Sequence, residues 1–509
     1  MATSLLSRIN PMNWLASAKP ARQGRDNAML ARMASLIKAR YDAAQTTPEN
    51  QRHWGMADGL SADAANSAGV RRIIRNRARY EVGNNPTLAG IVRTLVNDTI
   101  GTGPALQVKL PGNRAVAQFL EREFGAWAKR VNLTQKLWTA RKARAVDGEA
   151  FAIMRTNPKL RSPVKLDLSL LECDRIADPG TLGVDPLYID GVRLDEYDNP
   201  VSYTILRDHP GASVAFAVTQ YADVPAEYVL HWYSHERPEQ HRGVCEFVAS
   251  LSLGAHLRRY STATLSAAEL IALISVFIET DATAAAESDL PPFDTLQLER
   301  MLLSTVPKGS APQQAKPEQP SATFRDFHSA NVGMMGRPMC MTYSVAAGDF
   351  SRTSFSASRM EDRNYGSSID IDRVMVEEPI LTRIFEAWLD EARDIPGYLP
   401  LGVDALETIP HSWSWDSRPH VDPAKVASAA NMALKGGFAT LAQVYMEQSG
   451  EDWFDAIQQL AVEVQTCNSL GIPHPYQIQP GAGDSDPTDP NNDETQPDNE
   501  GATDADSAE

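Results

Sequence analysis

The chain has 509 residues, of which 43% are hydrophobic and 22% charged, so it can bury a large core and is expected to hold two or more structural units. Its net charge of −17 is concentrated at one end, because fifteen acidic and no basic residues follow Lys435, which leaves −2 for residues 1–435. This balance excludes a conventional nucleic-acid-binding protein, which needs a basic surplus to neutralise phosphates.

Two helices are predicted after a loosely ordered start. Residues 1–70 are expected to form a partly flexible arm with one amphipathic helix at Asn27–Ala44. A basic segment that begins at Arg71 is compatible with a helix and leads into Asn84-Asn85-Pro86. The next helix has apolar residues at three- and four-residue spacing and ends in Gly101-Thr102-Gly103, where glycines are free to take positive φ.

Strand-like runs separated by turns occupy residues 105–232, and we interpret this region as a mixed α/β segment. Asp178-Pro179-Gly180 and Asp198-Asn199-Pro200 supply turn chemistry between the runs. The clearest runs are Ala105–Leu110, Ala150–Arg155, Val201–Leu206 and Tyr228–Trp232.

Residues 245–392 show a helical pattern that is interrupted by a proline-rich segment. A long helix is predicted over Cys245–Glu279, and residues 280–321 are then rich in Pro, Ala, Ser and Gln, with a short helix at Thr295–Leu303. Helical character returns at Ala322–Pro338, before a glycine- and serine-containing loop at Thr342–Thr353. The next helix, Phe355–Ala392, is expected to be interrupted or kinked near Pro379.

The C-terminal part is predicted to be helical and then disordered. Helices are expected at Ser428–Leu434 and Thr440–Gln448, on either side of Gly436-Gly437, and at Asp452–Leu470. Residues 473–509 are interpreted as a disordered acidic tail, because they have no apolar periodicity. Such a tail is either solubilising or a means to repel DNA or bind a basic partner.

Signatures of catalysis are missing from the sequence, which has no GxxxxGK[ST], no GxGxxG and no GxSxG. His231, His235 and His241 are the tempting metal site, but ordinary surface or core histidines are favoured over zinc ligands. A metal-dependent hydrolase that uses His231 and His235 therefore stays an alternative from a different functional class. No metal and no cofactor are expected.

Other conspicuous residues have ordinary structural interpretations. Asp195 and Glu196 could act as paired carboxylates but fit a polar hairpin turn better. Trp413 and Trp415 would point to the same face of an extended segment, where core packing is the default and an inter-subunit contact the alternative. The apolar run Leu265–Ile278 contains Glu269 and is shorter than a membrane span requires, so no membrane association is expected.

A series of motifs occurs in collinear order from about Tyr41 to Gly471. They are Tyr41–Ala44 with Trp54, Asn84–Pro86 through Gly101–Gly103, Asp147–Phe151, Leu171–Ile176, Gly191–Tyr203, Val224–His231, Glu236–Pro238, Arg242–Val244, Phe355–Arg359, Asp422-Pro423 with Lys425, and Gly436-Gly437. In this order they resemble the lambda family of bacteriophage portal proteins. Phe355–Arg359 is similar to the family's YSSxR run, with Phe for Tyr and Ala for Ser. Asn199 stands where the family usually has glycine, and the resemblance is weak at Asp349–Ser358.

The resemblance implies an α+β portal fold that assembles as a ring of twelve subunits, with wing, stem, clip and crown regions. The two helices that flank the proline-rich segment fit the two stem helices, and the proline-rich segment itself fits the clip. The expected divisions are an N-terminal arm (1–70), a wing (71–244) completed by a long helix (359–420), a stem helix (245–279), a clip (280–321), a second stem helix (322–341), a tunnel loop (342–358), a helical crown (421–472) and the tail (473–509).

The resemblance also implies a non-enzymatic function. A portal ring lies at the capsid vertex of the virion, is assembled in the host cytoplasm, lets double-stranded DNA enter and leave, and joins head to tail. The implied partners are the terminase large subunit, head–tail adaptor proteins and the major capsid or scaffold protein. The side chains expected along the DNA channel are Ser351, Arg352, Thr353 and Arg359, with Arg352 the principal phosphate contact or else paired with Asp349 or Glu361. A scaffold or adaptor protein that acts through the acidic tail is a further alternative.

Overall fold

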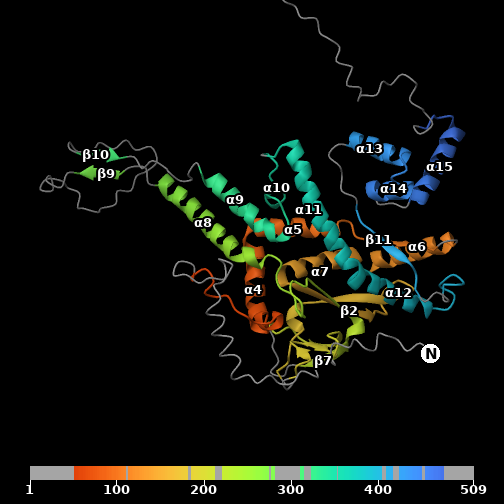
Figure 1. The fold of residues 1–509 in the computed structure, drawn as a ribbon, viewed down its shortest axis with the longest axis horizontal. Helices are drawn as coiled ribbons and strands as arrows, with labels where there is room; N and C mark the ends of the chain where they lie inside the picture. The colour runs from red at the N-terminus through yellow and green to blue at the C-terminus, as the bar shows by residue number, and fades with distance from the viewer. Residues whose placement is uncertain are drawn as a thin grey trace, which may run out of the picture. The chain divides into compact units, whose positions relative to one another are not determined.

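The computed structural model describes residues 51–110, 113–180, 185–212, 220–273, 277–280, 310–313, 323–351, 353–403, 408–416, 423–449 and 453–474. The helices expected at Asn27–Ala44 and Thr295–Leu303 lie outside these residues, as does the acidic tail from residue 475. The chain divides into a first unit, Met1–Ser61, and a second, Ala62–Glu509. All the helices and strands described below belong to the second unit (Figure 1).

The two predicted N-terminal helices are confirmed as α4 (Ala68–Asn84) and α5 (Pro86–Ile100), after a short α3 (Ala62–Ala65). Asn85 separates them, because its backbone is extended and its side-chain Oδ1 accepts hydrogen bonds from the backbone N–H groups of Thr87 and Leu88. Proline at the first position of α5 suits a helix start. Gly101, with a φ of 55°, ends α5.

Antiparallel sheets form where strand-like runs were predicted. In the three-stranded sheet, β2 (Glu149–Thr156) lies between β3 (Leu166–Leu171) and β8 (Val229–Tyr233). A second sheet has the order β4-β5-β6-β7, formed by Tyr188–Ile189, Val192–Leu194, Pro200–Leu206 and Tyr221–Pro225. A third pairs β1 (Ala105–Val108) with β11 (His411–Ser414). The short helices η3 (Cys173–Arg175) and η4 (Ala226–Tyr228) connect strands.

Two helices within residues 105–232 were not anticipated by the strand-and-turn interpretation. They are α6 (Arg114–Arg130) and α7 (Leu133–Asp147), and α7 packs against the sheet that contains β2 (Figure 1). Their buried residues include Leu120, Phe124 and Trp127, which recur at the three- and four-residue spacing of an apolar helix face. The mixed α/β character of the region is confirmed, but its helical share was underestimated.

The largest core cluster joins α6, α7 and the sheet to a helix from much later in the chain. Phe124 packs edge-on against Phe385 and Trp388, with ring centroids 5.6 Å apart in both pairs. Trp413, on β11, completes this aromatic group and is buried. Core packing is therefore confirmed as the explanation for Trp413.

The long helix predicted from Cys245 to Glu279 is α8 (Val248–Leu273), which is shorter at both ends. Its predicted C-terminal end is wrong, because Phe277–Thr280 forms strand β9, paired antiparallel with β10 (Ser310–Gln313) inside the proline-rich segment. The chain returns through α9 (Phe324–Gly336) and η6 (Arg337–Met339). No helix of the described residues is long and apolar enough to cross a bilayer.

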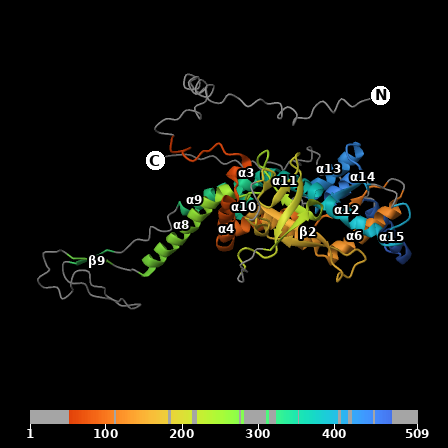
Figure 2. The same cartoon turned by 90° about the horizontal axis from the view of Figure 1, so that it is seen from below.

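Helices α8 and α9 lie side by side and run antiparallel (Figures 1 and 2). The Ser250 hydroxyl donates to the Met335 carbonyl at 3.0 Å, near the start of α8 and the end of α9. In the middle of α8 and at the start of α9, the Tyr260 ring stacks on Phe324 at a centroid distance of 5.7 Å. These contacts join the N-terminal half of α8 to α9, and α8 continues beyond them to Leu273.

The segment predicted as a loop at 342–358 is partly helical, so that prediction is wrong in part. Tyr343–Ala347 forms α10, which ends at Gly348 with a φ of 64°, and α11 begins at Phe355. The predicted interruption near Pro379 is confirmed, because α11 (Phe355–Val376) passes into a π-helical turn, η7 (Glu377–Thr382), before α12 (Arg383–Arg393). Proline cannot donate a backbone hydrogen bond, and the widened turn accommodates that loss.

The three predicted C-terminal helices are confirmed as α13 (Pro423–Lys435), α14 (Leu441–Ser449) and α15 (Trp453–Leu470). Gly437, with a φ of 68°, lies in the turn between α13 and α14. The guanidinium of Arg114, on α6, lies 3.7 Å from the ring centroid of Phe454 on α15. Arginine stacking thus connects these helices with α6.

Candidate functional site

Glu149, at the start of β2, is the centre of a buried ion network that joins several of the motifs noted in the sequence. Its carboxylate is fully buried and accepts hydrogen bonds from both Arg242 Nη2 (2.6 Å) and Arg242 Nε (2.9 Å). The Gly243 backbone N–H donates to the same carboxylate at 3.1 Å. Burial alone would raise the pKa of Glu149, but Arg242 and His231 hold it well below its usual value.

Glycines allow this close approach. Gly148 has a φ of 93°, and a Cβ there would lie 2.5 Å from the backbone of Val244. A Cβ on Gly243 would lie 2.1 Å from the carbonyl oxygen of Gly148. The two motifs Asp147–Phe151 and Arg242–Val244 therefore touch backbone to backbone, which explains why each contains a glycine.

The basic character of α4 arises from the same network. Arg71, Arg75 and Arg79 follow one another at four-residue intervals, so they share a face, and that face is turned inward. Arg75 Nη1 lies 2.7 Å from Asp174, while Arg79 pairs with Asp174 at 2.9 Å and with Asp147 at 2.7 Å. Arg71 pairs with Asp190. These arginines bind protein carboxylates rather than a nucleic acid.

A second network attaches α11 to α7. Asp372 accepts from Arg141 Nε at 2.8 Å and from Arg144 Nη1 at 2.5 Å, and Glu246 contacts both arginines at 3.0 and 3.2 Å. Burial would raise the pKa of Asp372, but the two guanidiniums lower it. Thr99, near the end of α5, also donates to Asp372. The carboxylate is therefore held in its charged form at the junction of three helices.

The residues of Gly101-Thr102-Gly103 are held by Asp416, after β11. The Thr102 backbone N–H and hydroxyl donate to the two Asp416 oxygens, both at 2.6 Å. Arg373, on α11, donates to backbone carbonyl oxygens of Asp98, Thr99 and Asp416. The end of α5 is thus bound to α11 and to the chain after β11.

The Asn84–Pro86 motif holds α8. Asn85 Nδ2 donates to the Gly254 carbonyl at 3.1 Å, and Arg258 pairs with Glu81 at 2.8 Å. A Cβ on Gly254 would lie 2.8 Å from Leu88 Cδ1, so glycine lets α8 cross the start of α5 closely. The same asparagine therefore caps α5 and anchors the long helix.

The three histidines considered as metal ligands are separated by other contacts. His231, with a side chain 6% exposed, approaches Glu149 at 3.3 Å and Tyr203 at 3.4 Å, and it stacks on Phe151. The Tyr233 ring packs against both His231 and His235, and His241 pairs with Asp63 at 2.7 Å. Zinc coordination by His231 and His235 is therefore not supported by this geometry. Asp195 and Glu196 lie in the β5–β6 turn, as predicted.

His231 provides a pH-dependent prediction. Burial lowers its pKa to about 4 from 6.5, outweighing the Glu149 carboxylate, which favours the charged ring. The unfolded chain therefore takes up the proton first as the pH falls. Stability from neutral His231 should be complete above about pH 6.5 and be lost as the pH falls toward 4. His231→Gln should flatten this part of the curve in urea titrations, and an unchanged slope would contradict a buried neutral histidine.

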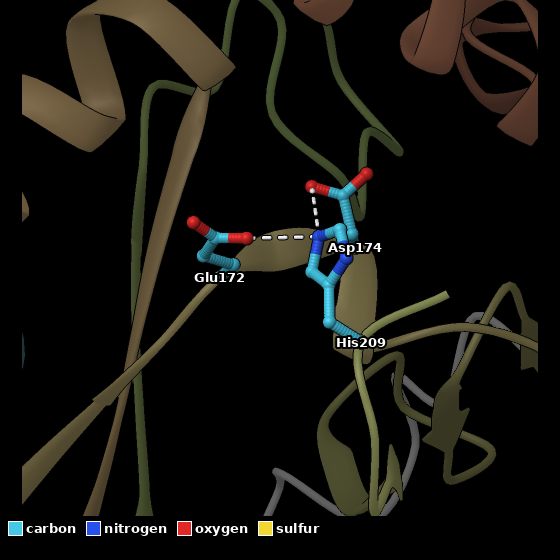
Figure 3. Close-up of side chains that lie close together, drawn as sticks. All are labelled: Glu172, Asp174 and His209. Atoms are coloured by element: carbon cyan, nitrogen blue, oxygen red, sulfur yellow. Dashed lines mark ion pairs between the residues drawn. The ribbon is translucent and has the colours of Figure 1, made fainter. Parts of the chain in front are cut away.

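Among the described residues, one group of three possible metal ligands does come together: Glu172, Asp174 and His209 (Figure 3). His209 Nε2 lies 2.8 Å from Glu172 and 3.5 Å from Asp174. However, Asp174 already pairs with two arginines, and the Gly211 backbone N–H donates to His209 Nδ1 at 2.9 Å. One ring nitrogen of His209 is therefore occupied by a backbone hydrogen bond and Asp174 belongs to the arginine network, so protein contacts explain the group without a metal.

The predicted channel residues lie around the α10–α11 connection, but Arg352 lies outside the described residues. Ser351 and Arg359 are exposed and Thr353 is half-buried, with its hydroxyl 2.9 Å from the Ser344 hydroxyl. Asp349, one alternative partner of Arg352, accepts from Tyr343 and the Ser351 N–H and lies 3.7 Å from Arg325. Glu361, the other, accepts from Thr342 at 3.2 Å. No hydrogen bond or ion pair joins the three described channel residues, Ser351, Thr353 and Arg359, to one another.

The two ion networks were not predicted from the sequence. Their members, such as Glu149 and Arg242, or Arg141 and Asp372, are far apart in the chain. The four-residue spacing of the α4 arginines was the available signal, since such a stripe requires acidic partners when it is buried.

Comparisons with known proteins agree with these motifs. A model of the phage portal proteins of the lambda family matches residues 48–369. The probable portal protein of Halomonas phage phiHAP-1 is 25% identical over 483 residues, covering 88% of this chain and 90% of that protein.

Two solved structures show partial likeness. One is the virion of a native gene transfer agent particle, with a TM-score of 0.40, 14% identity, and coverage of 76% of this chain and 93% of that one. The other is the neck of the native particle in C12 symmetry, with a TM-score of 0.39, 15% identity, and coverage of 72% and 90%. The assignment rests on the sequence matches: the chain belongs to the lambda family of phage portal proteins.

Proposed function

We propose that this portal protein of a phage-like particle forms a closed homo-oligomeric ring at the capsid vertex, through which DNA is packaged and ejected and to which the tail is joined. Family membership over residues 48–369 carries this proposal. The geometry supports a structural function, because the buried carboxylates Glu149 and Asp372 are each neutralised by arginines. We propose assembly in the host cytoplasm and a ring of twelve subunits, as the family resemblance implies.

The antiparallel pair α8 and α9 supports the assignment of a stem and a clip. The two helices are held together by Ser250 with Met335 and by Tyr260 with Phe324. Helix α8 continues beyond Tyr260 to Leu273, and β9 and β10 pair with each other within the stretch of chain between α8 and α9. The stem is accordingly proposed as α8 with α9, and the clip as the segment between them, with β9 at its start.

The wing is proposed to comprise residues 71–244 and 359–420, because the core cluster unites Phe124 with Phe385, Trp388 and Trp413. The crown is proposed to be α13, α14 and α15. Because α4 already begins at Ala68, the end of the proposed N-terminal arm and the start of the proposed wing both move three residues earlier. The proposed partners are double-stranded DNA, the terminase large subunit, head–tail adaptor proteins and the major capsid or scaffold protein.

The clip assignment predicts a selective loss of partner binding. Replacing residues 280–321 with a short Gly/Ser linker should leave the wing folded, since the described wing core is built from residues 100–168, 230–232 and 376–413. It should abolish capture of the terminase large subunit in a pull-down. The folding control is the far-ultraviolet circular dichroism spectrum of the variant, which should differ from that of the wild type only by the contribution of the replaced residues. Undiminished capture by a folded variant would contradict the clip assignment.

The channel assignment predicts that a charge reversal affects DNA rather than assembly. We propose that Thr342–Ser358 faces the DNA path and that Arg352 makes weak phosphate contacts, which salt screens. Arg352→Glu should leave the oligomer intact and reduce the packaged DNA. Arg122→Glu is the matched control, because Arg122 is an exposed arginine on α6. Normal packaging and full genome retention by Arg352→Glu would contradict phosphate contact.

A further inference from the structure

A closed ring is built from one repeated contact between two different faces of the same chain. We propose that the exposed face of α4 packs antiparallel against the exposed face of α11 from the next copy. This inference deepens the ring proposal and rests on it. The occupant of each face is therefore a second copy of this chain.

The outward face of α4 has an apolar stripe at regular spacing. Val70, Ile73 and Tyr80 are 40%, 50% and 56% exposed, which is unusual for side chains of this kind on a well-packed helix. With Arg77 and Asn84 they follow one another at intervals of three, four, three and four residues. This spacing keeps a stripe on one side of a helix that packs nearly parallel to another helix.

The outward face of α11 has the same spacing. Met360, Ile371 and Val374 are 61%, 55% and 64% exposed. With Asn364 and Ser367, both exposed, they follow one another at intervals of four, three, four and three residues. The opposite side of α11 holds the buried Tyr365 and Ile369 in the core, so the stripe is turned away from the rest of the protomer.

When the two helices are antiparallel, each residue of the α4 stripe faces one residue of the α11 stripe. The two pairs at one end of the register are apolar on both sides, and each of the other three pairs contains at least one polar residue. Each stripe covers fifteen residues, which is about 21 Å from first to last residue. The facing pairs are Val70 with Val374, Ile73 with Ile371, Arg77 with Ser367, Tyr80 with Asn364, and Asn84 with Met360.

The charges around the stripes are complementary. The exposed charges of α4 are the arginines Arg72 and Arg77, since its one acidic residue, Glu81, is buried with Arg258. The C-terminal half of the α11 stripe has the exposed carboxylate of Asp370 beside it, and Glu378 follows in the π-helical turn. In the antiparallel register, Arg77 faces Ser367, one turn from Asp370. The exposed arginines of α11, Arg359 and Arg363, lie in its N-terminal half, so this register brings Arg72 and Arg77 toward the half that has the carboxylates.

Within one protomer the two faces are not available to each other. Helix α5 packs against both α4 and α11 (Figure 1), and Ala78, Leu95 and Ile369 share a core cluster. The inward sides of α4 and α11 meet that core, so both stripes remain for a neighbour. Two unlike, mutually matching faces on one chain are what a heterologous ring contact requires.

Paired cysteines test the contact directly. In a background with Cys340→Ser and Cys467→Ser, the variant Ile73→Cys with Ile371→Cys is treated with a bifunctional thiol reagent that spans about 8–10 Å, the distance between packed helix axes. We expect a ladder of covalent multimers on a denaturing gel. Ile73→Cys with Met360→Cys is the matched control, because its facing positions are offset by about 16 Å, and it should give no ladder.

Single variants separate a heterologous from an isologous contact. Ile73→Cys alone and Ile371→Cys alone should each remain uncross-linked, because neither residue faces its own copy. Dimers from either single variant, or no ladder from the matched pair, would overturn the contact. Native mass measurement of the wild-type chain is made alongside. A wild-type ring without a ladder overturns this contact and leaves the ring, whereas a wild-type monomer overturns the ring itself.

Discussion

Glu149→Ala should lower the free energy of unfolding by about 3–5 kcal/mol, because it removes the nearest counter-charge of the buried Arg242, whose remaining carboxylate partner, Asp190, lies 3.4 Å away. Both side chains are within 1% of complete burial, so water cannot replace the lost carboxylate. The Gly243 N–H would also lose its acceptor. Urea unfolding at matched protein concentration measures the change.

Two further variants make this result specific. Glu386→Ala removes an exposed carboxylate from α12 and should change stability by no more than about 0.5 kcal/mol. Glu149→Leu combined with Arg242→Met removes both charges and should recover much of the loss, because an apolar pair of similar volume suits a buried site. Equal losses for Glu149→Ala and Glu386→Ala would contradict the network's importance.

Trp388→Ala should lower the free energy of unfolding by about 3–5 kcal/mol, through lost apolar burial and an unfilled cavity. Trp388 is completely buried and packs against both Phe124 and Phe385. It therefore connects α12 with α6, which are separated by more than 250 residues of chain. The measurement is thermal and urea unfolding with tryptophan-independent detection by circular dichroism.

The control for Trp388 is Trp54→Ala, since Trp54 is half exposed and belongs to the first unit of the chain. That variant should change stability by no more than about 0.5 kcal/mol. If the two tryptophan variants behave alike, α12 does not complete the wing core.

Local signals account for what the sequence could predict of the fold. Helices α4 and α5 were predictable because Asn85 and Pro86 provide a cap and a first-turn proline within three residues. The kink near Pro379 was predictable for the same reason. By contrast, α6 and α7 were missed, although Leu120, Phe124 and Trp127 follow helical spacing. The turn residues between the neighbouring strands favoured strands and turns throughout residues 105–232.

The candidate site was less predictable, because its contacts are set by the tertiary fold. The family motifs could be recognised in the sequence. Their structural role depends on contacts between distant residues, such as Gly148 with Val244 and Glu149 with Arg242, which the sequence does not reveal. The α4 arginines were read as a basic segment, whereas burial pairs them with carboxylates that lie 68 or more residues away. Sequence spacing gives a shared face and does not reveal what that face meets.

The central claim, a closed homo-oligomeric ring, is tested most directly by native mass measurement of the purified full-length chain across protein concentration and salt. The account predicts one dominant species at a fixed multiple of 55.7 kDa, and the same subunit number after truncation at residue 473. A stable 55.7 kDa monomer under every condition would contradict it.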